Sequence, residues 1–221
     1  MNNLPPLAER MRPKTLDDYV GQKHLVGPGA VLRKAIESGS LPSMIFWGPP
    51  GVGKTTLAYI ISQTLFRPFF SLSAINSGVK DVREVIEKAS LLKEQGETLP
   101  VLFIDEIHRF SKSQQDSLLG AVERGIVTLI GATTENPSFE VISALLSRCQ
   151  VYILQSLEEE DLLSLLNKAM KEDVVLKSKK IDIKEHEALL RLSGGDARKL
   201  LNIFELLVNA FEGKKITITN E

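Results

Sequence analysis

The sequence predicts an α/β fold in which a five-stranded parallel sheet with helices on both faces is followed by a small all-helical domain. Up to residue 154, short apolar segments of strand length alternate with segments of helical periodicity, the order that builds a parallel sheet. Beyond that point helical patterns dominate, in 157–170, 185–192 and 196–211. We therefore expect two domains, 1–154 and 155–221.

The expected strands are five apolar segments, at 44–47, 68–72, 101–104, 126–130 and 151–154. Helical periodicity marks the segments 29–38, 54–65, 79–92 and 111–123, and a further helix is expected through Val141, Leu145 and Leu146. Residues 1–24 are polar and marked by prolines, so we expect an arm that lies on the sheet domain. Residues 214–219 alternate in polarity and are compatible with a short strand, and the lysines at 177, 179 and 180 indicate a solvated loop.

Composition places the chain among soluble globular proteins, with 43% hydrophobic and 25% charged residues in 221. Lysine and arginine number 27 against 28 acidic residues, so bulk charge gives no sign of a nucleic-acid partner and any DNA contact must come from a local patch. The single cysteine, Cys149, excludes an internal disulfide and favours a reducing compartment. The first fifteen residues lack a signal-peptide core, and no long apolar run follows, so we expect a cytoplasmic protein without membrane contact.

One glycine-rich motif carries the chemistry. Residues 48–55 read GPPGVGKT and fit the spacing G-x-x-x-x-G-K-[ST], between an expected strand and an expected helix. Glycines let backbone N–H groups converge on phosphate oxygens, and a helix N-terminus favours an anion. The Lys54 ammonium can reach the β- and γ-phosphates, and the Thr55 hydroxyl can ligate Mg²⁺. The residues expected to contact the nucleotide here are Pro50, Gly51, Val52, Gly53, Lys54, Thr55 and Thr56.

Two carboxylates follow the third expected strand. Asp105 is expected to hold the Mg²⁺ shell, directly or through water, and Glu106 to orient and deprotonate the attacking water. The next strand ends in two threonines, and the hydroxyl of Thr134, or of its neighbour Thr133, can hydrogen-bond the γ-phosphate or the water. Adjacent solvated carboxylates and threonines of ordinary strand propensity are the alternative interpretations.

Two arginines are candidates for neutralising the charge that develops on the transferred phosphoryl group. Arg148 comes just before the fifth strand, and Arg198 lies in the first turn of the last helix, where a cation opposes the helix dipole and so suggests a nearby anion. A surface salt bridge is the alternative for each.

These motifs together resemble an AAA+ ATPase of the clamp-loader clade. The N-terminal segments ERMRPKTL (9–16) and VGQ (20–22), with SRC (147–149) and GDAR (195–198), are similar to segments of that clade. The stretches HRFSKSQQD (108–116) and GATTENPSFE (131–140) are very similar to the RarA/MgsA family, the replication-associated recombination ATPases related to the Werner-helicase-interacting ATPase of eukaryotes.

The resemblance implies a role for each matching residue. Thr134 matches the first sensor, with Thr133 as the alternative, and Arg198 matches the second sensor, acting in cis from the lid. Arg148 matches the arginine finger, which in this clade reaches the nucleotide of a neighbouring subunit. The positions that match the base and ribose pocket are Arg12, Tyr19, Val20 and Gly21.

The resemblance also implies a Mg²⁺-dependent, DNA-stimulated ATPase that acts at replication forks or single-strand/double-strand junctions of the bacterial nucleoid and contacts single-strand-binding protein. The family continues past its lid into a helical region that drives oligomerisation, whereas this sequence stops at Glu221. We therefore expect homo-oligomer formation, and with it the action of Arg148, to depend on that region.

Two other functions compete with an ATP-driven motor. A GTPase would carry an Asn-Lys-x-Asp base-reading motif, and residues 167–170 (NKAM) lack the aspartate, while a small-molecule kinase has no use for Arg148 and Arg198. A nucleotide-dependent scaffold or switch with negligible turnover is the second alternative. The presence of both Glu106 and Arg148 disfavours it, because a pure switch needs neither residue.

Overall fold

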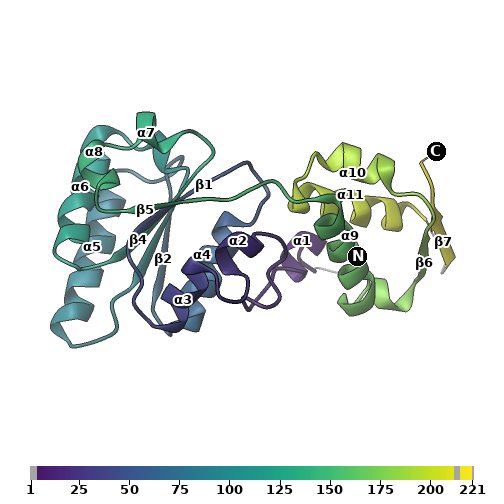
Figure 1. Ribbon diagram of the computed structural model, residues 1–221, viewed down its shortest axis with the longest axis horizontal. Coiled ribbons are helices and arrows are strands. Elements are labelled where there is room, and N and C mark those ends of the chain that lie inside the picture. Colours follow the sequence, from purple (N-terminus) through teal and green to yellow (C-terminus); the bar gives the residue numbers. More distant parts are fainter. Residues whose placement is uncertain (1–3, 212–214, 221) are drawn as a thin grey trace. The chain divides into compact units, whose positions relative to one another are not determined.

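The computed structural model describes residues 4–211 and 215–220 (Figure 1). The chain divides into two compact units, and each is described by itself. The sheet unit contains residues 22–49 and 54–154. The helical unit contains the described residues up to 21, the short segment 50–53 and the described residues from 155 onward.

The sheet unit holds five strands: β1 (Met44–Trp47), β2 (Phe69–Ser73), β3 (Val101–Asp105), β4 (Thr128–Thr133) and β5 (Gln150–Ile153). Their order is β2-β3-β4-β1-β5, and every neighbouring pair is parallel. The predicted five-stranded parallel sheet is confirmed. Because all five strands run the same way, their carboxyl ends meet at one edge, where ligands of such sheets bind.

Helices cover both faces of the sheet (Figure 1). They are α2 (Lys23–Val26), α3 (Val31–Glu37), α4 (Lys54–Thr64), α5 (Val79–Glu94), η1 (Ile107–Arg109), α6 (Lys112–Glu123), α7 (Pro137–Glu140) and α8 (Ser143–Leu146). One core cluster packs α5, α6 and α8 against the strands through side chains such as Val82, Leu118 and Leu145, all fully buried. On the other face α3 and α4 lie against the sheet, and α4 contacts β3 and β4.

Two predictions from the sequence differ from the structure of this unit. The fourth strand begins at Thr128 rather than residue 126, because the Ile126 N–H donates to the Ala121 carbonyl and prolongs the turn that ends α6. The single helix expected through Val141 is wrong, since Val141 lies between α7 and α8. The Ile142 N–H donates to the buried Gln115 side chain (2.8 Å), which holds the chain in that break.

The helical unit contains α1 (Leu7–Arg10), α9 (Glu159–Glu172), η2 (Leu176–Ser178), β6 (Lys180–Ile183), α10 (Glu187–Ser193), α11 (Ala197–Ala210) and β7 (Lys215–Ile218). The amphipathic patterns of α9 and α11 place their leucines in one apolar core with Phe204 and Val208. The Asp196 side chain caps α11 by accepting from the Lys199 N–H (2.9 Å).

The prediction that this domain is all-helical needs correction. The strands β6 and β7 form a parallel pair with Ile181 opposite Ile216, so the short strand expected near 214–219 is confirmed, although Lys214 lies outside the described residues. The loop expected at the lysine run is only partly present, because Lys180 begins β6 and the Lys179 ammonium donates to the Val208 carbonyl. The alternation of exposed and buried side chains explains why residues 215–218 form a strand, since Ile216 and Ile218 are buried while their neighbours are exposed.

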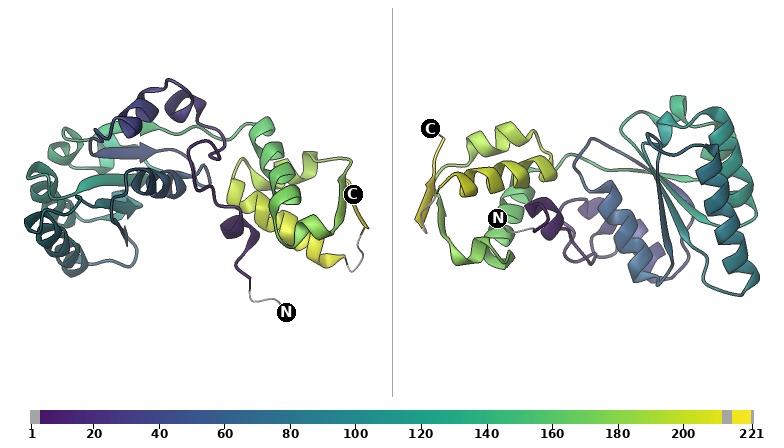
Figure 2. Two further views of the ribbon diagram at one scale, coloured as in Figure 1. Left: turned by 90° about the horizontal axis from the view of Figure 1, so that it is seen from below. Right: turned by 180° about the vertical axis from the view of Figure 1, so that it is seen from behind.

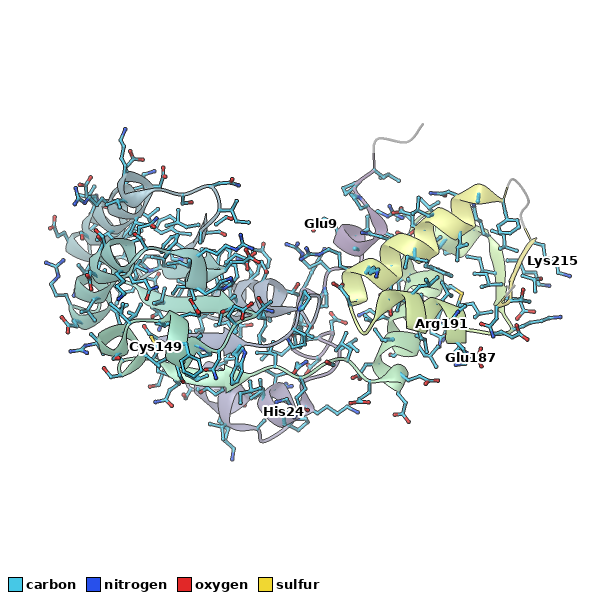
Figure 3. All side chains as sticks on the ribbon, turned by 90° about the horizontal axis from the view of Figure 1, so that it is seen from above. Glu9, His24, Cys149, Glu187, Arg191 and Lys215 are labelled. Carbon is cyan, nitrogen blue, oxygen red and sulfur yellow. The ribbon has the colours of Figure 1, made fainter. Side chains whose placement is uncertain are left out.

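The N-terminal arm groups with the helical unit rather than with the sheet. Leu7 is fully buried in the core of that unit, and α1 packs along α11 (Figure 2). In Figure 3, Glu9 marks α1 beside the last long helix. The expected position of residues 1–24 on the sheet domain therefore differs from the structure for the residues up to Gly21. Within the described ranges, none of the helices has the length and apolar character needed to cross a membrane.

Candidate functional site

Lys54 lies at the carboxyl end of β1, where it begins α4. Only 9% of the residue is exposed, and its ammonium donates to the carbonyls of Gly48 and Pro49, both at 2.7 Å. The Gly48 N–H in turn donates to the Thr133 carbonyl, which ties the loop to the end of β4. Thr55 and Thr56 follow in the first turn of α4, both partly exposed. A cation and the free N–H groups of a helix N-terminus therefore meet at this edge of the sheet.

The centre of the glycine-rich loop, residues 50–53, is packed within the helical unit. Gly51 and Gly53 have φ angles of 74° and 92°, which favour glycine. A Cβ at Gly51 would overlap the Asp196 carboxylate, and one at Gly53 would lie 2.7 Å from the Tyr19 hydroxyl. The Ala197 N–H also donates to the Gly51 carbonyl (3.3 Å). Both glycines are therefore required by backbone conformation and by close neighbours.

The arm brings Tyr19 to this loop. Its hydroxyl donates to the Val52 carbonyl at 3.0 Å, and the ring is buried. Burial raises the pKa of Tyr19 well above its ordinary value, so the hydroxyl remains a donor at neutral pH. Gly21 is buried as well, since a Cβ there would lie 2.5 Å from the Leu157 side chain.

The other two base-pocket candidates also lie in the arm. Val20 packs against the core of the helical unit, and Arg12 pairs with Glu9 at 2.7 Å.

Asp105 and Glu106 end β3 at the same sheet edge as Lys54. Asp105 Oδ1 accepts from the Glu106 N–H (3.1 Å). Glu106 has φ 52° and ψ 48°, a left-handed conformation that is costly for a residue with a Cβ. Its buried Oε2 forms an ion pair with Arg109 Nε at 2.6 Å but accepts no hydrogen bond from the described residues. A strained, incompletely satisfied carboxylate thus lies beside the loop that holds Lys54.

The two candidate threonines differ in their surroundings. Thr133 is 1% exposed, and its hydroxyl lies 3.0 Å from His108 Nδ1 and contacts the backbone of Glu135 through two hydrogen bonds. Thr134 follows the end of β4, is partly exposed, and makes no side-chain hydrogen bond with the residues that the structure describes. Thr133 is thus engaged internally, whereas the Thr134 hydroxyl is available to a ligand.

Arg148 lies at the opposite edge of the sheet from Lys54, just before β5 begins at Gln150. Its guanidinium pairs with Glu123 at 2.6 Å and donates to the Ala144 carbonyl at 2.7 Å and the Ser147 hydroxyl at 3.0 Å. Both side chains of the ion pair are 42% exposed, and both line a shallow pocket with Leu41 and Thr128. The sheet unit therefore does not bring Arg148 to its own Lys54.

Arg198 is exposed in the first turn of α11, two residues after the Asp196 cap. Across the two described ranges it forms no ion pair or side-chain hydrogen bond. Its guanidinium is accessible to an anion, as the sequence suggested for a cation at this helix end.

The oxygen donors present suit Mg²⁺ better than a softer metal. Thr55 offers a hydroxyl without an internal hydrogen bond in the described part of the chain, and Asp105 has a second carboxylate oxygen besides the one bonded to Glu106. No group of three or more His, Cys, Asp or Glu side chains that could hold a metal occurs among residues 4–211 and 215–220. A Mg²⁺ ion here would therefore complete its shell with phosphate oxygens and water, as this ion prefers.

Sequence reasoning missed two neighbours of the site. Asp196 was not among the candidate site residues, and its contact with Gly51 leaves no local sequence pattern. His108 lies three residues after Asp105 and contacts Thr133, a pairing that the strand order creates. Cys149, labelled in Figure 3, is buried in the sheet unit. Burial raises its pKa to about 11, so the thiol is protonated and unreactive at neutral pH.

The family whose sequence model matches this chain is the "ATPase family associated with various cellular activities (AAA)", over residues 44–157. That range contains residues 48–55, both carboxylates that end β3, Thr134 and Arg148.

Curated relatives carry the names that the motifs suggested. The chain is 50% identical to replication-associated recombination protein A of Coxiella burnetii over 94% of this chain and 47% of the relative. The protein of the same name from Escherichia coli K12 is 47% identical over 97% and 49%, and ATPase WRNIP1 of Dictyostelium discoideum is 44% identical over 93% and 24%. The resemblance to the RarA/MgsA family is confirmed. The chain spans about half the length of these bacterial relatives.

Solved structures agree with the fold. The RuvB Holliday junction branch migration motor of Thermotoga maritima matches with a TM-score of 0.74 and 28% identity, covering 95% of this chain and 70% of that one. A variant of the same protein matches with a TM-score of 0.75 and 29% identity, covering 94% and 69%. The nucleotide-binding α/β fold predicted from the sequence is confirmed.

Proposed function

Because this chain belongs to the AAA family of ATPases, we propose that it binds ATP at residues 48–55 and hydrolyses it to ADP and phosphate. The observation that carries the proposal is the Lys54 side chain, which is held by the first two carbonyls of the glycine-rich motif. Its ammonium is buried against two loop carbonyls at the N-terminus of α4, and the loop glycines have no room for side chains. Such a loop presents N–H groups and one cation to an anion, the chemistry that a triphosphate requires.

The proposed phosphate contacts are the Lys54 ammonium and the backbone of Pro50, Gly51, Val52, Gly53, Thr55 and Thr56. Arg198 is proposed to neutralise phosphate charge from the last helix, and its exposure and lack of an internal anion in the described chain support this role. The base and ribose are assigned to Arg12, Tyr19, Val20 and Gly21. Tyr19, Val20 and Gly21 are packed into the helical unit. This packing supports a pocket wall that is formed before the nucleotide binds.

Thr55 and Asp105 are proposed to hold Mg²⁺ together with the phosphates. When bound, the ion would neutralise charge on the β- and γ-phosphates. Glu106 is proposed to accept the proton of the attacking water. Its strained backbone supports this assignment, because such strain is typical of residues at functional sites.

Thr134 is proposed as the hydroxyl that senses the γ-phosphate or orients the water. The matched pair of variants Thr134→Val and Thr133→Val tests the choice between the two threonines. We expect Thr134→Val to lower turnover about 10- to 100-fold, the cost of a hydrogen bond to a charged group, with an unchanged melting temperature. Thr133→Val removes hydrogen bonds to His108 and Glu135, so it should destabilise the fold by about 1–3 kcal/mol instead. Loss of turnover in Thr133→Val alone, without destabilisation, would reverse the assignment.

Calorimetric titration with ATP and Mg²⁺ tests the proposed function directly. We expect Lys54→Ala to weaken ATP binding about 10- to 100-fold, because a charge-assisted contact to the phosphates is lost. Lys34→Ala, on the exposed face of α3, is the matched control and should bind as the wild type does. Equal ATP affinity in the wild type and Lys54→Ala would contradict binding at this loop.

We also propose that the ATPase acts on DNA at replication forks or single-strand/double-strand junctions, in the cytoplasm and nucleoid of a bacterium. The names of its relatives support a role in replication-associated recombination, and the similarity to a Holliday junction motor supports branched DNA as the substrate. Lys80 and Arg83 on α5 and Lys112 at the start of α6 are exposed candidates for phosphate contacts. Single-strand-binding protein and further copies of the chain are the proposed protein partners, and DNA is expected to stimulate turnover.

A further inference from the structure

A buried ion-pair network fastens the N-terminal arm to two helices of the helical unit. The Arg10 guanidinium binds Asp173 through two hydrogen bonds, from Nε to Oδ2 (2.7 Å) and from Nη2 to Oδ1 (3.0 Å). Its Nη1 donates to Glu205 Oε1 (2.8 Å) and to the Pro5 carbonyl (2.6 Å). Asp173 caps the end of α9 and Glu205 lies on α11, so one side chain of α1 joins both helices.

The network is largely shielded from water, and each of its carboxylate oxygens accepts at least one hydrogen bond. The side chains of Arg10, Asp173 and Glu205 are 11%, 1% and 22% exposed. The second oxygen of Glu205 accepts from the Leu7 N–H (2.8 Å), and Asp173 Oδ1 also accepts from the N–H groups of Val175 and Leu176. A bidentate arginine pair with this burial fixes distance and angle, unlike an exposed surface pair.

The charges of the pair are stable over a wide pH range. Burial acts to raise the pKa of Asp173, but the hydrogen bonds from Arg10 and from the backbone of Leu176 and Val175 outweigh it and hold the pKa below its ordinary value. The hydrogen bond to Asp173 raises the pKa of Arg10. Because the folded pKa of Asp173 is lowered, this stabilisation is fully present above the ordinary value of 3.8 and is lost as the pH falls through the folded value.

Arm residues beyond the network touch the glycine-rich loop. Tyr19 donates to the Val52 carbonyl and lies against Gly53. Asp18, next to it, pairs with Lys168 on α9 (2.7 Å), which holds this end of the arm to the same helix. The hydrogen bond from Lys168, with a second from Thr15, lowers the pKa of Asp18. The arm is thus fastened at Arg10 and at Asp18, and Tyr19 meets the loop beside the second point.

We propose that Arg10, Asp173 and Glu205 are positioning residues for nucleotide binding, which hold the arm so that Tyr19 supports the centre of the loop. This proposal rests on the proposed function, since it assumes that the loop binds ATP. The hydrogen bonds of the network all run to residues of the helical unit itself, and none of these partners is assigned to the chemical step. Its loss should therefore raise KM and leave the turnover number at saturating ATP close to that of the wild type.

The test compares three variants in ATP titrations and steady-state kinetics. Asp173→Asn keeps an acceptor for Val175 and Leu176 but removes the charge, Arg10→Lys keeps the charge but loses the bidentate geometry, and Glu205→Gln changes the most exposed member. We expect Asp173→Asn to raise KM and the ATP Kd about 10- to 100-fold, the effect of weakening one or two contacts to the ligand, with smaller increases in the other two. Glu159→Gln, which breaks an exposed pair with His186 in the same unit, is the control and should change neither value.

A double-mutant cycle with Tyr19→Phe separates positioning from general stability. If the network acts through Tyr19, then Asp173→Asn should add little to the loss of ATP affinity already caused by Tyr19→Phe. A merely structural network would lower the fraction of active protein, so the maximal rate would fall at constant KM and the two losses would add. That result, or an unchanged Kd in folded variants, would overturn the inference. Should Asp173→Asn not fold, Glu205→Gln replaces it in the cycle. Wild-type protein that binds no ATP would instead overturn the proposed function.

Discussion

Replacing Glu106 with glutamine is expected to lower the rate of ATP hydrolysis about 10²- to 10⁴-fold, the contribution of a positioned general base. Glutamine keeps the size of the side chain but cannot accept the proton of the attacking water. Glu106 lies at the end of β3 with a left-handed backbone and one buried oxygen that accepts no hydrogen bond from the described chain. Phosphate contacts do not depend on it, so the ATP Kd should be unchanged.

The measurement is single-turnover hydrolysis at saturating ATP, together with a calorimetric Kd. Glu94→Gln, an exposed carboxylate near the end of α5, is the matched control and should hydrolyse ATP at the wild-type rate. Full turnover in Glu106→Gln would exclude Glu106 as the base. Loss of ATP binding in the same variant would mean that its carboxylate serves binding, directly or through Asp105.

Replacing Arg148 with alanine is expected to lower turnover about 10³- to 10⁵-fold, the value of an arginine delivered to the transferred phosphoryl group. Arg148 precedes β5, whereas Lys54 follows β1, and these strands are parallel with Met44 opposite Gln150. A four-residue strand spans about 13 Å, so the two cations belong to opposite edges of the sheet. We therefore expect Arg148 to act on the nucleotide of a neighbouring copy under conditions in which copies associate, and ATP affinity to be unchanged in the variant.

Mixing tests this action between subunits. A Glu106→Gln copy carries an intact Arg148, and an Arg148→Ala copy carries an intact Glu106, so a mixture of two inactive variants should recover part of the wild-type turnover. Arg124→Ala, at the end of α6 beside Glu123, is the control for loss of a nearby arginine and should be fully active alone. Wild-type turnover in Arg148→Ala, or no recovery on mixing, would contradict the proposed role.

The local sequence pattern predicted most strands of the sheet unit correctly. The apolar segments that form β1, β2, β3 and β5 are within about one residue of their predicted bounds. β1 and β3 are almost entirely buried, and buried strands leave continuous apolar runs, whereas β2 and β5 are apolar but partly exposed. The predicted start of the fourth strand, at residue 126, was too early. Ile126 and Val127 are apolar like strand residues, but they are buried in the turn before β4. The break at Val141 was missed because the side chain that holds it, Gln115, comes from another helix.

The glycine-rich loop and the two carboxylates were picked out from local spacing, and the structure places Lys54 and Glu106 at one edge of the sheet. What local spacing could not give are pairings between distant segments. Arg10 and Asp173 are separated by 163 residues, and neither lies in a sequence motif from which their pairing could be predicted. The left-handed backbone conformation of Glu106 likewise could not be predicted from the sequence, because its surroundings impose this strained conformation and the residue's own propensity does not favour it.

The most direct test is steady-state ATP turnover per protomer over a series of protein concentrations, with and without forked DNA. An ATPase that needs Arg148 from a neighbouring copy should turn over faster per protomer as concentration rises, and faster again when forked DNA is added. Turnover that stays at background throughout, in protein that binds ATP, would contradict hydrolysis and indicate a nucleotide-dependent switch. Substantial turnover that is independent of protein concentration well below any assembly threshold would show that each copy hydrolyses ATP alone, and would contradict the role of Arg148 between subunits.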